Sequence, residues 1–217
     1  MNKTLNKAYF IVSLIGVILA FASAILVPVQ ILADVEIPGV VSRWVNVAVM
    51  AFLLATIIMS IFLVKGVIKK IAQIFMGIGI LAILALTVLN NLKVGIGEFE
   101  QILYYVFAGA LIFGAILWIF TLFVKKFKSE EKAPYFFAFE MLVFGLITLL
   151  TITGLVPNLE TSFAYTFAVR ILIGLVTNLY HSLELKHTDS NKPLIVFAVL
   201  LFIALSFPMA IAYSTIL

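Results

Sequence analysis

The chain has 217 residues and a net charge of +4, and 65% of its residues are hydrophobic while only 11% are charged. This composition, with a mean hydropathy of +1.26, lies far outside the range of soluble domains and indicates an integral membrane protein. The lack of cysteine excludes disulfides and thiolate metal sites. The positive charge does not indicate a nucleic-acid partner, because the cations lie in short segments beside apolar runs.

Seven apolar runs cover most of the chain and are almost free of charge. Each has at least about 18 residues, which at 1.5 Å per residue is enough to cross a hydrocarbon layer of roughly 30 Å. We therefore predict a single all-α domain, residues 1–217, which is a bundle of seven transmembrane helices with spans at residues 8–32, 44–64, 71–91, 102–124, 135–156, 163–183 and 194–216.

The first run resembles a secretory signal at its start, where Lys3 and Lys7 precede it and Ala22-Ser23-Ala24 resembles a cleavage site. The apolar stretch continues to Leu32, which is too long for a signal peptide. We therefore predict that this run is a true span.

The distribution of lysine and arginine predicts the orientation, because these residues are retained on the cytoplasmic side of the membrane. Eleven of the 14 lie on one side of the predicted topology: Lys3, Lys7, Lys65, Lys69, Lys70, Lys125, Lys126, Lys128, Lys132, Lys186 and Lys192. Only Arg43 and Lys93 flank the other side. We predict a cytoplasmic N-terminus and an outer C-terminus. Aromatic residues, Tyr9 and Tyr180 among them, lie near predicted span ends and indicate an interfacial belt.

Polar and small residues share one face of three predicted spans at three- and four-residue steps. The third span carries Gln73, Gly77, Thr87 and Asn91, the fifth carries Glu140, Thr148, Thr151 and Asn158, and the sixth carries Arg170, Gly174, Thr177, Asn178 and His181. Such faces normally turn toward the interior of a bundle, where polar groups hydrogen-bond between helices or line a wet cavity.

Glu140 and Arg170 stand out because an ionisable group inside a span costs at least about 2.5–3.5 kcal/mol. Glu140 lies toward the cytoplasmic end of its span and Arg170 toward the outer end of the next, roughly 10 Å apart in depth at 1.5 Å per residue. Side chains tilt toward their own helix N-terminus, which sends these two in opposite directions. We therefore expect that they form no ion pair and that each can reach its nearer interface.

Glu140 is expected at nearly the depth of Asn178 and His181, which predicts a polar cluster of these residues, with Glu184 beside it. His181 and Glu184 stand three residues apart, a spacing at which one helix can offer two metal ligands. A catalytic zinc usually takes three His or carboxylate ligands, and the chain has only two histidines. A metal-dependent intramembrane enzyme is therefore the weakest alternative, and we expect no metal, no cofactor and no catalytic residues.

These patterns predict a transporter or binding protein of the cytoplasmic membrane for a small solute or amphiphile, using the polar faces of the third, fifth and sixth spans. Its expected partners are the lipid bilayer and a small-molecule or lipid ligand. The alternative is a non-catalytic structural or regulatory subunit, whose partner is a second copy of the chain or another membrane protein. The predicted substrate-binding residues are Glu140, Arg170, Thr177, Asn178 and His181.

Overall fold

A computed structural model describes residues 3–33, 39–124, 130–155 and 159–186, together with Phe197 and Val199. These residues form six helices: α1 (Lys3–Ala33), α2 (Gly39–Leu63), α3 (Val67–Asn91), α4 (Phe99–Phe120), α5 (Ala133–Ile152) and α6 (Leu159–Glu184). No strand occurs in this part of the chain. Apart from Phe197 and Val199, the seventh predicted span, residues 194–216, lies outside the described residues.

Five helices contain a segment long and apolar enough to cross a membrane. The segments are Lys3–Ser23, Arg43–Leu63, Val67–Asn91, Phe99–Phe120 and Ala133–Ile152. The prediction of an all-helical, multi-pass membrane protein is confirmed. The sixth predicted span, residues 163–183, falls within α6.

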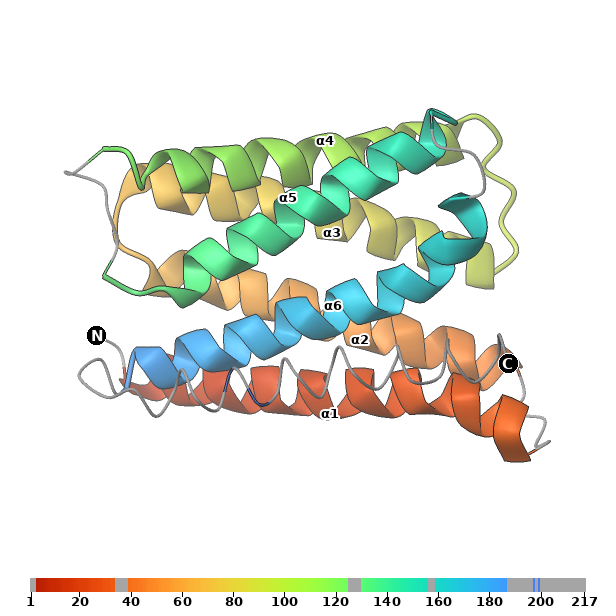
Figure 1. The fold of residues 1–217 in the computed structure, drawn as a ribbon, viewed down its shortest axis with the longest axis horizontal. Helices are drawn as coiled ribbons and strands as arrows, with labels where there is room; N and C mark the ends of the chain where they lie inside the picture. The colour runs from red at the N-terminus through yellow and green to blue at the C-terminus, as the bar shows by residue number, and fades with distance from the viewer. Residues whose placement is uncertain are drawn as a thin grey trace.

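Helices that follow one another in the sequence run antiparallel and lie side by side (Figure 1). Each of α1 to α5 contacts its successor, α6 contacts α1, and α2 also contacts α6. The six helices therefore close into a ring of neighbours. The residues Ile171 to Ser182 of α6 are buried without interruption, so this stretch of helix is covered on every side.

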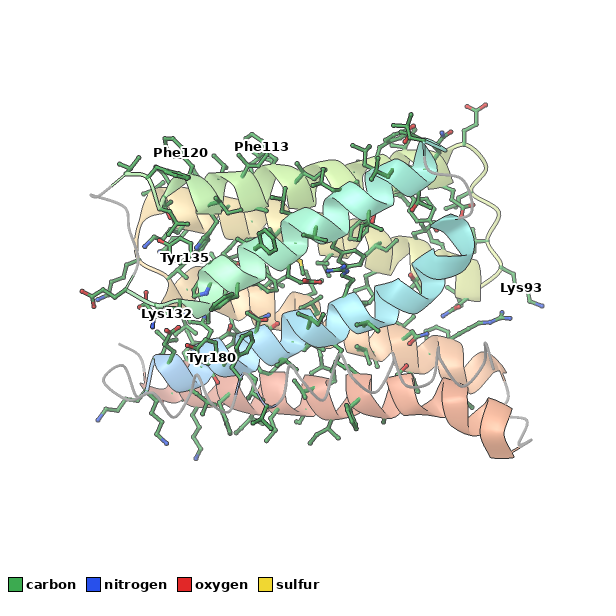
Figure 2. All side chains as sticks on the ribbon, in the orientation of Figure 1. Lys93, Phe113, Phe120, Lys132, Tyr135 and Tyr180 are labelled. Carbon is green, nitrogen blue, oxygen red and sulfur yellow. The ribbon has the colours of Figure 1, made fainter. Side chains whose placement is uncertain are left out.

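The two ends of the bundle differ in charge. One end, which we call the lysine-rich end, holds the start of α1 and the end of α6, and its described cations are Lys3, Lys7, Lys65, Lys69, Lys70, Lys132 and Lys186. The described cations Arg43 and Lys93 lie toward the opposite end. Figure 2 shows Lys132 and Lys93 at the two ends of the molecule.

Small residues allow three helices to approach closely. A β-carbon at Gly114 of α4 would lie 2.6 Å from the Ala72 carbonyl oxygen of α3. A β-carbon at Gly145 of α5 would lie 3.0 Å from the Ala108 carbonyl oxygen of α4. In membrane helices, where lipid is as apolar as leucine, such backbone contacts supply much of the packing energy.

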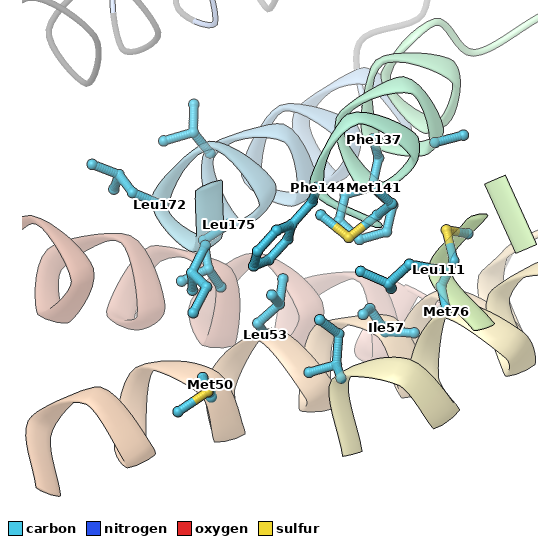
Figure 3. Packing of buried hydrophobic residues seen from close by; sticks show 14 of the residues in the cluster. Met50, Leu53, Ile57, Met76, Leu111, Phe137, Met141, Phe144, Leu172 and Leu175 are labelled. Carbon is cyan, nitrogen blue, oxygen red and sulfur yellow. The ribbon is translucent and has the colours of Figure 1, made fainter. Parts of the chain in front are cut away.

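The core lies between the helices and is filled by large apolar side chains. Figure 3 shows Leu53, Phe137, Met141 and Phe144 meeting at its centre, and the rings of Phe107 and Phe144 make an edge contact at 5.0 Å. Large apolar side chains are also exposed along the outer faces, among them Ile18, Ile74, Leu81, Phe113 and Ile116. This arrangement, apolar inside and outside, is typical of a bundle that lipid surrounds.

Candidate functional site

Glu140 of α5 and Arg170 of α6 form an ion pair within the bundle. Arg170 donates from Nη1 to both carboxylate oxygens of Glu140, over 2.9 Å to Oε1 and 3.0 Å to Oε2. The side chain of Glu140 is 10% exposed and that of Arg170 is 24% exposed. Our expectation that these two residues do not pair is therefore wrong.

The prediction was wrong because it assumed that each whole side chain follows the direction of its Cα–Cβ bond, toward the N-terminus of its own helix. An arginine side chain has enough rotatable bonds to turn back along its own helix, so its guanidinium can reach a carboxylate at a different depth on a neighbouring helix. An unpaired charge in an apolar bundle is costly, whereas a paired and hydrogen-bonded one is much less so. Pairing is thus the cheaper arrangement even though the two α-carbons differ in depth.

The ion pair leaves most of the guanidinium unused. A guanidinium has five N–H donors on three nitrogens, and both bonds to Glu140 come from Nη1 alone. Within the described part of the chain, Nε and Nη2 have no hydrogen-bond partner. About a quarter of the side chain is exposed, and unused guanidinium donors are suited to binding carboxylate or phosphate oxygens.

Asn178 and His181, the next polar residues of α6, bond to α1 and α2. The Tyr9 hydroxyl of α1 donates to Asn178 Oδ1 over 2.9 Å and lies 3.3 Å from Nδ1 of His181. Asn178 Nδ2 donates to Thr56 Oγ1 of α2 over 3.0 Å, and Thr56 in turn donates to the Leu53 carbonyl. The four polar residues form a buried network across three helices.

The geometry of this network fixes its protons. If the single Tyr9 proton goes to Asn178, the 3.3 Å contact with His181 is a hydrogen bond only when His181 carries its proton on Nδ1. In the neutral imidazole this tautomer leaves the lone pair on Nε2. Tyr9 is 0% exposed, so this network is closed to bulk water at that residue.

The predicted cluster around Glu140 is therefore divided. No hydrogen bond or ion pair joins Glu140 to Asn178 or His181 among the described residues, and Glu140 pairs with Arg170 instead. Thr177 is buried, and its hydroxyl donates to the Ile173 carbonyl of its own helix over 2.8 Å. The five predicted site residues thus separate into three groups. Glu140 and Arg170 form an ion pair, Asn178 and His181 belong to a buried network, and Thr177 bonds to the backbone of its own helix.

Glu184 caps another helix. Its Oε1 accepts from the Lys132 amide over 2.8 Å and its Oε2 accepts from the Ala133 amide over 3.0 Å, at the N-terminus of α5. A carboxylate at this position satisfies amides that have no partner within their own helix and interacts favourably with the helix dipole. Both of its oxygens accept backbone amides, so Glu184 serves as a helix cap in this structure.

The polar faces predicted on the third and fifth spans are mostly satisfied by backbone. Thr148 and Thr151 of α5 donate to carbonyls four residues earlier, and Thr87 of α3 does the same. Gln73 is buried, and its Oε1 has no hydrogen-bond partner among the described residues. Asn91 lies nearer the surface and donates to the Arg43 carbonyl over 3.4 Å. Asn158 lies outside the described residues.

Two residues of the buried network were not predicted as site residues. Tyr9 was interpreted as an interfacial aromatic, yet it is fully buried, and Thr56 drew no attention because it is a lone hydroxyl in an apolar run. Ser13 of α1 is buried as well. The Oγ of Ser13 has no hydrogen-bond partner in the described segments. The signal that could have found Tyr9 is its four-residue spacing from Ser13, which places both on one face of α1.

The described residues contain no group of three histidine or carboxylate side chains that could hold a metal ion. Comparison of the chain with models of protein families, with curated proteins and with solved structures gives no match. The functional argument therefore depends on the chemistry of the residues themselves.

Proposed function

We propose that this chain is a transporter or binding protein for a small anionic solute or amphiphile, and that Arg170 binds the anionic group. We further propose seven spans in the cytoplasmic membrane, with the lysine-rich end toward the cytoplasm. The positive charge gathered at that end supports this orientation. Phe197 supports a seventh helix, because its ring stacks on both Phe136 and Tyr180, at 5.5 and 4.7 Å.

The observation that carries the proposal is that only one of the three guanidinium nitrogens of Arg170 donates to Glu140. Glu140 holds Arg170 through one nitrogen, and the other two nitrogens have no hydrogen-bond partner in the described part of the chain, while the side chain as a whole is 24% exposed. In a low-dielectric bundle, a fixed guanidinium binds carboxylate or phosphate oxygens with good geometry and strong attraction. Glu140 then serves two purposes, since it orients Arg170 and keeps the site from holding a net charge when it is empty.

A transport cycle follows from the same pair. An arriving anion competes with Glu140 for the guanidinium, and a weakened pair loosens the contact between α5 and α6. Release of the anion lets Glu140 recover Arg170 and restores the packed state. The buried network of Tyr9, Asn178 and Thr56 holds α6 to α1 and α2 in both states, so motion is confined to the α5 side.

The alternative is a non-catalytic subunit of a membrane complex, and one observation favours it. The predicted site residues Thr177, Asn178 and His181 of α6 already have partners within the bundle, as expected for side chains that only hold helices together. In that case Arg170 and Glu140 are a structural ion pair, and the partner is a second copy of the chain or another membrane protein.

Thermal stability of the purified protein in a neutral detergent distinguishes the two functions. The compounds to test are small carboxylates, phosphates and anionic amphiphiles, because a ligand that binds only the folded state raises the apparent melting temperature. We expect at least one of them to stabilise the wild type and to have no effect on the double variant Glu140→Gln/Arg170→Gln. That variant removes both charges together and so leaves no unpaired charge in the bundle.

The matched control is Arg43→Gln, which removes an exposed cation of α2 that takes no part in the ion pair. It should respond to the same compound as the wild type does. A compound that stabilises all three proteins equally binds elsewhere and contradicts the proposal. If no compound stabilises the wild type, the subunit alternative is favoured.

A further inference from the structure

A second candidate site lies at the lysine-rich end, apart from the ion pair. It is a pocket of about 460 Å³ between the α2–α3 turn, the segment before α5 and the end of α6. Eight residues line it: Phe62, Leu63, Val64, Lys65, Gly66, Lys70, Glu131 and Leu185. Neither Arg170 nor Glu140 is among them.

The lining is divided into an apolar part and a charged part. Phe62, Leu63, Val64 and Leu185 supply the apolar wall, while Lys65, Lys70 and Glu131 supply the charges. Two cations and one carboxylate leave the lining with a net charge of +1. A ligand with one negative charge and an apolar portion complements it, whereas a polyanion meets the repulsion of Glu131.

The turn between α2 and α3 brings the two lysines to the same pocket. Lys65 precedes Gly66, whose φ of +100° lies in the region that favours glycine, and α3 begins at Val67. Lys70 follows within the first turn of α3. Both lysines are exposed, so their ammonium groups are available to a ligand.

The depth of the pocket identifies the source of the ligand. The segments Arg43–Leu63 and Val67–Asn91 are each long and apolar enough to cross a membrane, and only three residues separate them. A turn this short between two spans lies at the level of the lipid headgroups. Phe62, which lines the pocket, is 69% exposed, and Val67 next to the turn is 72% exposed, so this end of the two helices presents large apolar side chains on its surface.

We propose that this pocket binds a monoanionic phospholipid, with the phosphodiester between Lys65 and Lys70 and the start of an acyl chain against Phe62. The inference is independent of the proposed function, since it uses no residue of the ion pair. A bound lipid would connect the ends of α2, α3 and α6, because residues from all three helices or their adjoining turns line the pocket. It would therefore stabilise the lysine-rich end of the bundle.

The test uses the full-length protein, delipidated in a neutral detergent and titrated with phosphatidylglycerol. Native mass spectrometry counts the bound lipids, and the melting temperature reports their effect on stability. Lys65→Gln/Lys70→Gln should weaken phosphatidylglycerol binding at least tenfold. The matched control is Lys3→Gln/Lys7→Gln, which removes two exposed cations at the same end but outside the pocket and should change binding less than twofold.

A second variant tests the pocket without changing its charge. Leu185→Trp places a larger side chain in the cavity and should also weaken binding, while both lysines remain. Melting temperatures without lipid show whether each variant folds, and the lysine variants should match the wild type because their side chains are exposed.

Three results would overturn the inference. Equal losses in the two lysine pairs would mean that only the overall charge attracts the lipid. Unchanged binding in Lys65→Gln/Lys70→Gln would place the lipid elsewhere. Glycerol phosphate binding as tightly as phosphatidylglycerol, with no gain from the acyl chains, would mean a soluble phosphate site rather than a lipid site.

Discussion

The Tyr9 hydroxyl of α1 donates to Asn178 Oδ1 of α6 over 2.9 Å, which joins the first described helix to the last. This bond fixes the packing of α1 against α6 at a point that is fully buried. It also makes the network sensitive to the loss of a single oxygen atom.

Tyr9→Phe should lower the free energy of unfolding by about 1–2 kcal/mol, because the variant leaves the Asn178 oxygen without its donor in a buried place. Denaturant unfolding in detergent, followed by circular dichroism, measures the change. Tyr105→Phe is the control, since that tyrosine is 43% exposed on α4 and should tolerate the change. Equal effects in the two variants would contradict the network.

A double-mutant cycle tests the ion pair in the absence of any ligand. Glu140→Gln leaves Arg170 unpaired, and we expect a loss of about 1–3 kcal/mol, below the full value for a buried pair because Arg170 is partly exposed. Adding Arg170→Gln should recover part of that loss, with a coupling energy of at least about 1 kcal/mol. Additive effects would show that the two charges act independently, as the sequence analysis expected.

Glu184→Ala should destabilise the protein by about 1–2 kcal/mol, because two amides at the start of α5 lose a charged acceptor. Hydrogen exchange should locate the effect, with faster exchange at Lys132 and Ala133 and little change in α3. Glu130→Ala removes an exposed carboxylate nearby and should leave both measurements unchanged. A general loss of protection across the bundle would argue against a local capping role.

Two glycines of α4 should respond in opposite directions to alanine. Gly114→Ala places a β-carbon 2.6 Å from the Ala72 carbonyl oxygen, so α3 and α4 must move apart, and we expect a loss of about 1–3 kcal/mol. Gly109 has open space around it, and Gly109→Ala should stabilise the helix by up to about 1 kcal/mol. Melting temperatures in one detergent suffice, and a shift of the same sign in both would contradict the close packing.

The sequence was sufficient for the class of fold, because apolar length is a direct requirement of the bilayer. Helix ends were harder to predict, since a helix can begin before its apolar run and can also end before that run does. α1 begins at Lys3 rather than near residue 8, because its polar first turn is still helical. α5 ends at Ile152 rather than near residue 156, and Gly154 with φ of +67° follows its end.

The site was harder to predict than the fold for a related reason. Helical periodicity says which residues share a face, and it placed Asn178 and His181 together correctly. It does not say which helix lies opposite, so the partners on α1 and α2 could not be inferred from α6 alone. The prediction that Glu140 and Arg170 do not pair was wrong for a different reason. The depth of an α-carbon does not determine where the end of a long, flexible side chain lies.

The closed ring of helices imposes an order on biosynthesis. Tyr9 enters the membrane about 170 residues before its partner on α6 exists, which at 5–20 residues per second is a delay of roughly 10–30 s. During that time its hydroxyl has only lipid, α2 or the insertion machinery beside it. The contacts of α1, α2 and α5 with α6 can therefore form only after α6 has been synthesised, and until then the bundle is incompletely packed.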